Sequence, residues 1–108
     1  MLQSKESINI GIVGLGLIGG SLSLDLQKRG YKVHGVTHRP DTAKIAKQRS
    51  LATVISTDPG ILKNCSIIIL ALPIQELLNP SSELINAIPK NAIVTDVASV
   101  KVPILGLW

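Results

Sequence analysis

The sequence predicts an α/β fold with a doubly wound parallel sheet of the Rossmann type, and three observations lead to this prediction. Short apolar runs rich in Ile, Val and Leu alternate with segments of helical periodicity. The run at residues 66–72 is apolar on both faces, which is typical of a strand covered on both sides. A Gly-x-Gly-x-x-Gly motif at residues 14–19 follows the first apolar run and precedes a helical pattern.

The first strand–helix unit begins with an apolar run over residues 8–13, which has the length and composition of a strand. Residues 17–29 then show apolar side chains at helical spacing, and Gly30 is a natural stop for this helix. We expect this apolar stripe to pack on the core rather than to form a binding face. It consists of Ile18, Leu22 and Leu26.

The second unit combines an alternating strand at residues 32–37 with a helix at residues 42–49. Residues 52–55 give a weak third strand. Asp58 is then a natural N-cap, and the proline that follows it suits the first helical position. A short helix is therefore expected to run from there to Asn64.

The fourth strand, residues 66–72, is expected to be central because both of its faces are apolar. Helical patterning follows over residues 75–87, where Pro80 is expected to kink or split the helix. Residues 92–97 form the fifth strand, and residues 99–107 begin a further helix. In such sheets a ligand lies at the switch point, here between the carboxyl ends of the first and fourth strands.

Length and composition indicate one domain over residues 1–108, which carries a net charge of +4 and 45% hydrophobic residues. The longest apolar run, residues 67–73, is too short for a membrane helix, and residues 1–7 lack the apolar core of a signal peptide. The single cysteine, Cys65, excludes a disulfide framework and a multi-cysteine metal site, so we expect a cytoplasmic protein. Seven of the eleven Lys and Arg residues lie within residues 28–49, but no recognisable nucleic-acid-reading motif accompanies them, and we expect no nucleic-acid partner.

The glycine motif predicts dinucleotide binding. Gly14 permits a tight turn, Gly16 lets a pyrophosphate approach the backbone, and Gly19 allows the helix to pack closely on the strand. The phosphates would then meet unpaired N–H groups at the positive end of the helix dipole. The alternative is a glycine-rich turn that binds nothing. The expected contact residues are Gly14, Leu15, Gly16, Leu17, Ile18 and Gly19.

The end of the second strand favours NADP(H) over NAD(H). An acidic residue at this point would accept hydrogen bonds from the adenosine ribose, but the chain has Thr37, His38 and Arg39 instead. These side chains donate hydrogen bonds, and Arg is suited to bidentate contact with phosphate. Thr42 adds a hydroxyl or an N–H group, whereas a rotated loop would bring Asp41 toward the ribose. The alternative is that Arg39 is an ordinary exposed cation.

Three stretches together resemble the prephenate/arogenate dehydrogenases, which are NAD(P)-dependent enzymes of tyrosine biosynthesis. Residues 14–22 resemble the opening of that family, and residues 72–75 resemble its loop after the fourth strand. The most specific stretch is Thr95-Asp96-Val97-Ala98-Ser99-Val100-Lys101, at residues 95–101. The likeness is strongest to the NADP-dependent arogenate branch, in agreement with the missing acidic residue after the second strand.

The resemblance implies hydride transfer from C4 of arogenate or prephenate to the nicotinamide, with loss of carbon dioxide. It places Ser99 near the ring hydroxyl and the nicotinamide, although a helix N-cap is the alternative role of this residue. Leu72 and Pro73 are expected beside the ribose–nicotinamide half of the cofactor, and Gln75 is a weaker candidate. The full-length enzymes of the family are expected to be homodimers.

The sequence departs from the family where a catalytic histidine is expected. The family histidine belongs to a Gly-Gly-His-Pro segment that would follow residue 108, and neither His34 nor His38 is placed to replace it. We therefore expect the cofactor-binding portion of such an enzyme, without the helical C-terminal domain, able to bind NADP(H) but nearly inactive. Residues 104–108 are expected to leave apolar surface that favours self-association.

Two other functions share the glycine motif. A β-hydroxyacid dehydrogenase has a similar glycine loop and a similar basic exit from the second strand, with its catalytic lysine expected on a later helix. A non-catalytic NADP(H)-sensing module is a rival from another class, because a fold does not determine a function. The stretch at residues 95–101 favours the tyrosine pathway over the first rival.

Overall fold

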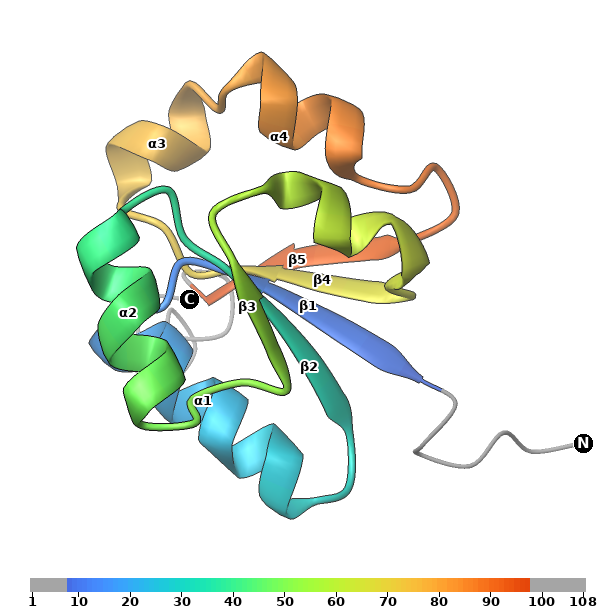
Figure 1. The fold of residues 1–108 in the computed structure, drawn as a ribbon. Helices are drawn as coiled ribbons and strands as arrows, with labels where there is room; N and C mark the ends of the chain where they lie inside the picture. The colour runs from blue at the N-terminus through green and yellow to red at the C-terminus, as the bar shows by residue number, and fades with distance from the viewer. Residues whose placement is uncertain (1–7, 98–108) are drawn as a thin grey trace, which may run out of the picture.

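The computed structural model describes residues 8–97, and within them it forms one five-stranded parallel sheet (Figure 1). The strand order is β3-β2-β1-β4-β5, so the predicted doubly wound Rossmann arrangement is confirmed. The strands, in chain order, are β1 Asn9–Val13, β2 Lys32–Val36, β3 Val54–Ser56, β4 Ile67–Leu70 and β5 Ile93–Asp96.

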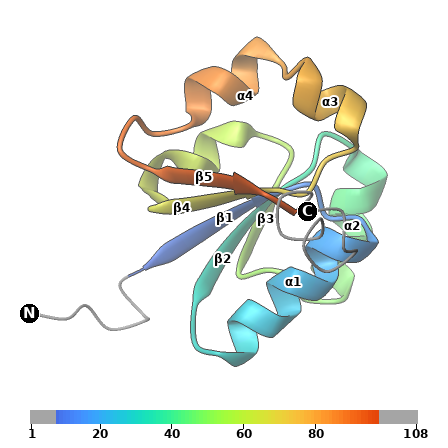
Figure 2. The same ribbon diagram turned by 180° about the vertical axis from the view of Figure 1, so that it is seen from behind.

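Helical segments cover the two faces of the sheet (Figures 1 and 2). The segments are α1 Leu17–Lys28, α2 Pro40–Gln48, the 3₁₀ helix η2 Pro59–Asn64, α3 Ile74–Leu78 and α4 Ser82–Ala87. Helices α1 and α2 lie over one face, and η2 and α4 lie over the other. None of the helices in residues 8–97 combines the length and apolar character that a bilayer crossing requires.

Strand β1 occupies the centre of the sheet. Its Ile12 lies beside Gly35 of β2 on one side and beside Ile69 of β4 on the other. The chain therefore leaves β1 toward β2 and β3, then crosses over to β4 on the opposite side of β1. This reversal places the switch point between the carboxyl ends of β1 and β4, as the sequence predicts.

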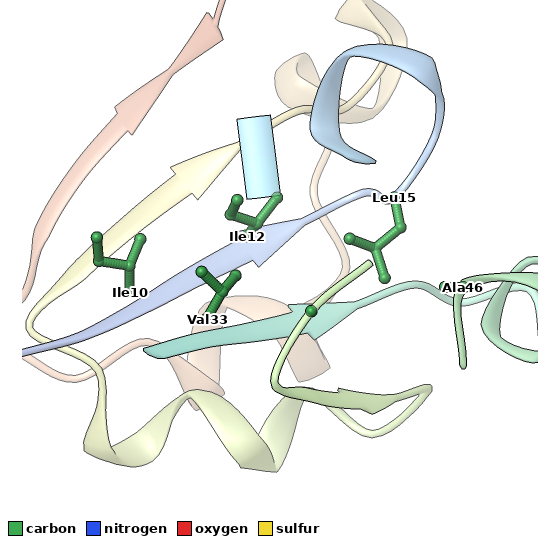
Figure 3. Packing of buried hydrophobic residues seen from close by; sticks show 6 residues of the cluster. Ile10, Ile12, Leu15, Val33 and Ala46 are labelled. Carbon is green, nitrogen blue, oxygen red and sulfur yellow. The ribbon is translucent and has the colours of Figure 1, made fainter. Parts of the chain in front are cut away.

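The core has two parts, one on each face of the sheet. Beneath α1 and α2, Ile12 and Val33 are fully buried and pack with Ile10, Leu15 and Ala46 (Figure 3). Full burial of one aliphatic side chain of this size contributes about 1.5–3 kcal/mol. The second part lies beneath η2 and α4 and consists of Val13, Val36, Leu62, Cys65, Ile68 and Leu84.

Most predicted elements are present, and the differences have local causes. The helix expected at residues 75–87 is split around Pro80, and α4 begins where Ser81 Oγ accepts a hydrogen bond from the Leu84 N–H at 3.2 Å. The Asp58 carboxylate caps η2 by accepting from the Gly60 N–H at 2.8 Å. The helix expected to begin at residue 42 begins two residues earlier, at Pro40.

Two further expectations differ from the structure or cannot be compared with it. The third strand was predicted at residues 52–55, but β3 comprises residues 54–56. At residue 53 the contact with β2 runs partly through a side chain, because the Thr53 side-chain oxygen accepts a hydrogen bond from the Val33 N–H at 3.0 Å. Regular pairing begins one residue later, with Val54 beside His34. The helix expected at residues 99–107 lies outside the described residues.

Candidate functional site

A cleft of about 1220 Å³ opens at the carboxyl ends of β1 and β4. Its walls come from the β1–α1 turn, the exit of β2, the loop after β4, and the α3–α4 segment. All twelve residues predicted to contact a cofactor line this one cleft, although they come from three separate parts of the sequence. They are Gly14, Leu15, Gly16, Leu17, Ile18, Gly19, Thr37, His38, Arg39, Thr42, Leu72 and Pro73.

The β1–α1 turn is held together by close backbone contacts. Gly14 has a φ of +99°, a conformation that other residues rarely adopt, and its N–H donates to the Val36 carbonyl at 2.7 Å. A Cβ atom on Gly14 would overlap the Ala71 carbonyl oxygen, and one on Gly19 would overlap the Gly14 carbonyl oxygen. These two glycines are therefore required by packing within the protein itself.

Gly16 differs from both neighbours in the motif because a Cβ atom there would meet nothing within 4 Å. It is the N-cap residue of α1 and has no side chain with which to satisfy the first N–H groups of that 12-residue helix. Open space therefore lies directly beside backbone donors and the positive end of a helix dipole. This arrangement fits a pyrophosphate group.

The exit of β2 forms a second wall. Thr37 is only 6% exposed, and its side-chain oxygen accepts a hydrogen bond from the Arg39 N–H at 3.3 Å. Arg39 is exposed and is the N-cap residue of α2. Thr42 lines the cleft from the first turn of α2, but Asp41, in the same turn, is not part of the lining. The turn thus brings a guanidinium group and hydroxyl groups to the cleft without a carboxylate.

The α3–α4 segment supplies the part of the site that the sequence analysis missed. Glu76 of α3 lines the cleft, and its Oε1 atom lies 3.8 Å from His38 Nε2. The two residues are 38 positions apart, so no local motif relates them. Figure 1 shows α3 beside the loop that joins β2 to α2. The further lining residues that were missed in this segment are Asn79, Pro80, Ser81, Glu83 and Leu84.

Other missed residues lie near the carboxyl ends of the strands. The rule that ligands bind at these ends of a doubly wound sheet was a signal for several of them. They are Val13, Val36, Thr57, Pro59, Ala71 and Val97. Gln75, the weaker candidate, also lines the cleft.

The first turn of α1 corrects one expectation about the apolar stripe. Ile18 was expected to pack on the core, but it is 45% exposed and lines the cleft. Leu22 and Leu26 do pack against the core, as predicted. The reason is that Gly19, Gly20 and Ser23 form the buried face at the start of α1, so the Ile18 side chain faces away from the core. Leu17 is 89% exposed and also lines the cleft.

Ser99, the expected catalytic residue, lies outside the described residues, as does the apolar stretch at 104–108. Val97, two positions before Ser99, lines the cleft. The carboxyl end of β5 therefore lies at the edge of the candidate site.

Two chemically versatile side chains are used elsewhere in the fold. His34 Nδ1 lies 3.1 Å from the Ile61 carbonyl oxygen, on the face covered by η2. Cys65 is buried in the core, and burial raises the pKa of its thiol to about 11, so it is protonated at neutral pH. Among residues 8–97, no group of three His, Cys, Asp or Glu side chains is arranged to hold a metal ion.

Comparison with known proteins identifies a protein family to which this chain is similar. The model of the prephenate dehydrogenase nucleotide-binding domain matches residues 22–106. The structure of an arogenate dehydrogenase from Synechocystis is similar at 39% sequence identity with a TM-score of 0.77; the match covers 94% of this chain and 38% of that one.

Two further solved structures are similar. A prephenate dehydrogenase from Aquifex aeolicus, in complex with hydroxyphenyl propionate and NAD⁺, is 25% identical with a TM-score of 0.69; the match covers 82% of this chain and 32% of that one. A 3-hydroxyisobutyrate dehydrogenase from Mycobacterium tuberculosis is 21% identical with a TM-score of 0.70, over 82% of this chain and 31% of that one, which shows a shared fold. The chain thus spans about a third of the length of these proteins.

Proposed function

The chain belongs to the prephenate dehydrogenase family as its nucleotide-binding domain, and from this premise we propose that it is the NADP(H)-binding portion of an arogenate or prephenate dehydrogenase. The observation that carries the proposal is the open position at Gly16, in a turn whose other two glycines are fixed by packing. Packing within the protein does not require a glycine at position 16, whereas a pyrophosphate bound close to the backbone would require one.

The preference for NADP(H) rests on the exit of β2. Arg39 and Thr42 line the cleft there, and the nearby carboxylate of Asp41 does not. A guanidinium group forms bidentate hydrogen bonds with phosphate, whereas an NAD-selective site places a carboxylate against the ribose hydroxyls. The A. aeolicus relative was solved with NAD⁺, so cofactor choice is the point on which the proposal differs from a known relative.

We propose a separate role for each of three of the four walls of the cleft. The backbone of the β1–α1 turn would bind the pyrophosphate, and the exit of β2 would hold the adenosine end. Leu72 and Pro73 would form the wall beside the nicotinamide, and Ser99 would lie near the ring hydroxyl of the substrate. The nicotinamide, when bound, supplies the hydride acceptor for oxidation and decarboxylation of arogenate or prephenate.

We propose that residues 1–108 bind the cofactor without appreciable turnover. The similar dehydrogenases are about three times as long, and the family histidine expected after residue 108 would handle a proton. A general acid–base contributes roughly 10²–10⁴-fold to a rate, so its absence alone would make turnover slow. Within a complete enzyme, we propose a cytoplasmic homodimer acting on a small-molecule substrate in tyrosine biosynthesis.

Calorimetric titration of the purified chain with NADP⁺ and NAD⁺ tests the proposal. We expect tighter binding of NADP⁺, and Arg39→Ala should weaken NADP⁺ binding by roughly tenfold while leaving NAD⁺ binding unchanged. Arg49→Ala is the matched control, because it removes the same charge from the opposite end of α2. Equal affinity of the unsubstituted chain for the two nucleotides would refute the preference, and binding of neither would refute the proposed function.

A further inference from the structure

A carboxylate faces the proposed phosphate-binding residues from the opposite wall of the cleft. Glu76 lies on α3, and its Oε1 atom is 3.8 Å from Nε2 of His38, at the exit of β2. The His38 side chain is 69% exposed and that of Glu76 is 42% exposed, so both are reachable from the cleft that they line. The pair joins two elements that belong to separate halves of the sheet.

The charges around this pair are divided between the two walls. His38 and Arg39 lie on the wall formed by the β2–α2 loop, while Glu76 and Glu83 lie on the wall formed by α3 and α4. Asp41, the acidic residue nearest in sequence to Arg39, is not part of the lining. Glu76 is therefore the carboxylate that pairs with the exit of β2.

We infer that Glu76 is a specificity-determining residue that limits the preference of the cleft for a 2′-phosphorylated adenosine. The inference rests on the proposed function, because it assigns the 2′-phosphate to the exit of β2. His38 Nε2 lies 3.8 Å from Glu76 Oε1, and a single ring nitrogen cannot be directed at that carboxylate and at a phosphate oxygen at the same time. In addition, the carboxylate and the phosphate carry charges of the same sign and repel each other.

Glu76 is expected to weaken the binding of NADP(H) more than the binding of NAD(H). NADP(H) and NAD(H) share the pyrophosphate, so repulsion between Glu76 and that group cancels in the ratio of their dissociation constants. The 2′-phosphate is the only charge that differs between them. A change in the ratio therefore reports the interaction of Glu76 with that phosphate and with the residues that bind it.

The test compares NADP⁺ and NAD⁺ binding to the complete 108-residue chain and to Glu76→Gln, which retains the size of the side chain. Because the pair is exposed, we expect the ratio of the NAD⁺ to the NADP⁺ dissociation constant to rise by roughly two- to fivefold. Asp25→Asn is the control: it removes one negative charge from the far end of α1, where Asp25 pairs with Arg29. The ratio of this control should remain unchanged.

A second pair of variants locates the effect at His38. In a His38→Asn background, the gain from Glu76→Gln should shrink, because the competition for Nε2 is gone. An unchanged ratio in Glu76→Gln, or a rise of equal size in Asp25→Asn, would overturn the inference. An equal gain with and without His38 would overturn the part assigned to the pair. Circular dichroism of each variant verifies folding.

The outcomes also separate this inference from the proposed function. If the unsubstituted chain prefers NADP⁺ and Glu76→Gln leaves the ratio unchanged, the inference about Glu76 fails and the proposed function stands. If the unsubstituted chain binds neither nucleotide, the proposed function itself is wrong and the inference falls with it. Equal binding of both nucleotides refutes the preference for NADP(H) assigned to the exit of β2.

Discussion

The β1–α1 turn and the exit of β2 border the same cleft but present different kinds of groups to it. The turn offers backbone, and its Gly14 and Gly19 are fixed by contacts that leave no room for a Cβ atom. The exit of β2 offers side chains, of which Arg39 and His38 are exposed and Thr37 is buried. Under the proposed function, the turn would determine whether a dinucleotide fits, and the exit of β2 would determine which nucleotide is preferred. Substitutions in the turn should therefore cause large losses of stability or of affinity for both nucleotides. Substitutions at the exit of β2 should cause smaller changes in the preference between the two nucleotides.

The largest expected effect is on stability, from Gly19→Ala. The added Cβ atom would overlap the Gly14 carbonyl oxygen, which belongs to the backbone and has little freedom to move. We expect a loss of about 1–3 kcal/mol in the free energy of unfolding, measured by urea denaturation. Gly20→Ala is the control in the same helix, because its Cβ atom would be 3.4 Å from Leu51 and in ordinary contact. Equal stability of Gly19→Ala and the unsubstituted chain would contradict the described packing.

Gly16→Ala should have the opposite profile. The new methyl group would point into open space, so the free energy of unfolding should change by less than about 0.5 kcal/mol. The same methyl group would occupy the place proposed for the pyrophosphate, and the affinity for NADP⁺ and NAD⁺ should fall together by at least about tenfold. Calorimetry and urea denaturation on one preparation measure both quantities. Undiminished binding by this variant would mean that the nucleotide does not use the turn.

A smaller effect is expected at the exit of β2, from Thr37→Val. This substitution retains the shape of the side chain and removes the hydroxyl that accepts a hydrogen bond from the Arg39 N–H. We expect a loss of about 1 kcal/mol in stability and a lower preference for NADP⁺, because Arg39 is less firmly positioned. Thr42→Val serves for comparison, since Thr42 is only half-buried and lines the same wall. A larger loss of stability in Thr42→Val than in Thr37→Val would contradict the conclusion that Thr37 is the threonine that stabilises this wall.

The smallest effect concerns Cys65, which lies in the core away from both regions. Burial raises the pKa of its thiol from 9.0 to about 11, so the unfolded chain loses this proton at lower pH than the folded protein does. Its contribution to stability is therefore complete below pH 9 and is lost as the pH rises to about 11. The difference in unfolding free energy between the unsubstituted chain and Cys65→Ala should diminish over that interval. A constant difference would indicate that the thiol is not protected.

The sequence predicts those residues of the cleft whose positions are determined by the local geometry of the chain. A glycine motif between a strand and a helix determines its own backbone, and the residues after β2 and β4 lie at known ends of parallel strands. Glu76 was missed because its place beside His38 depends on how α3 packs across the sheet. The glycine motif correctly placed Ile18 at the cleft, but the prediction that Ile18 packs on the core was wrong. The spacing of apolar residues did not show that the small residues Gly19, Gly20 and Ser23 form the buried face there.

The position of β1 between β2 and β4 has a consequence for the order of assembly. Ile10 pairs with Val33 after a short excursion of the chain, but its pairing with Ile67 must wait for a segment 57 residues away. Closing a longer loop costs more entropy, so the β1–β4 contact is expected to form late. The candidate cleft lies at the carboxyl ends of those two strands and is thus completed only after the first half of the sheet has formed. During synthesis, the chain would therefore be unable to bind a ligand in this cleft until β4 has been made.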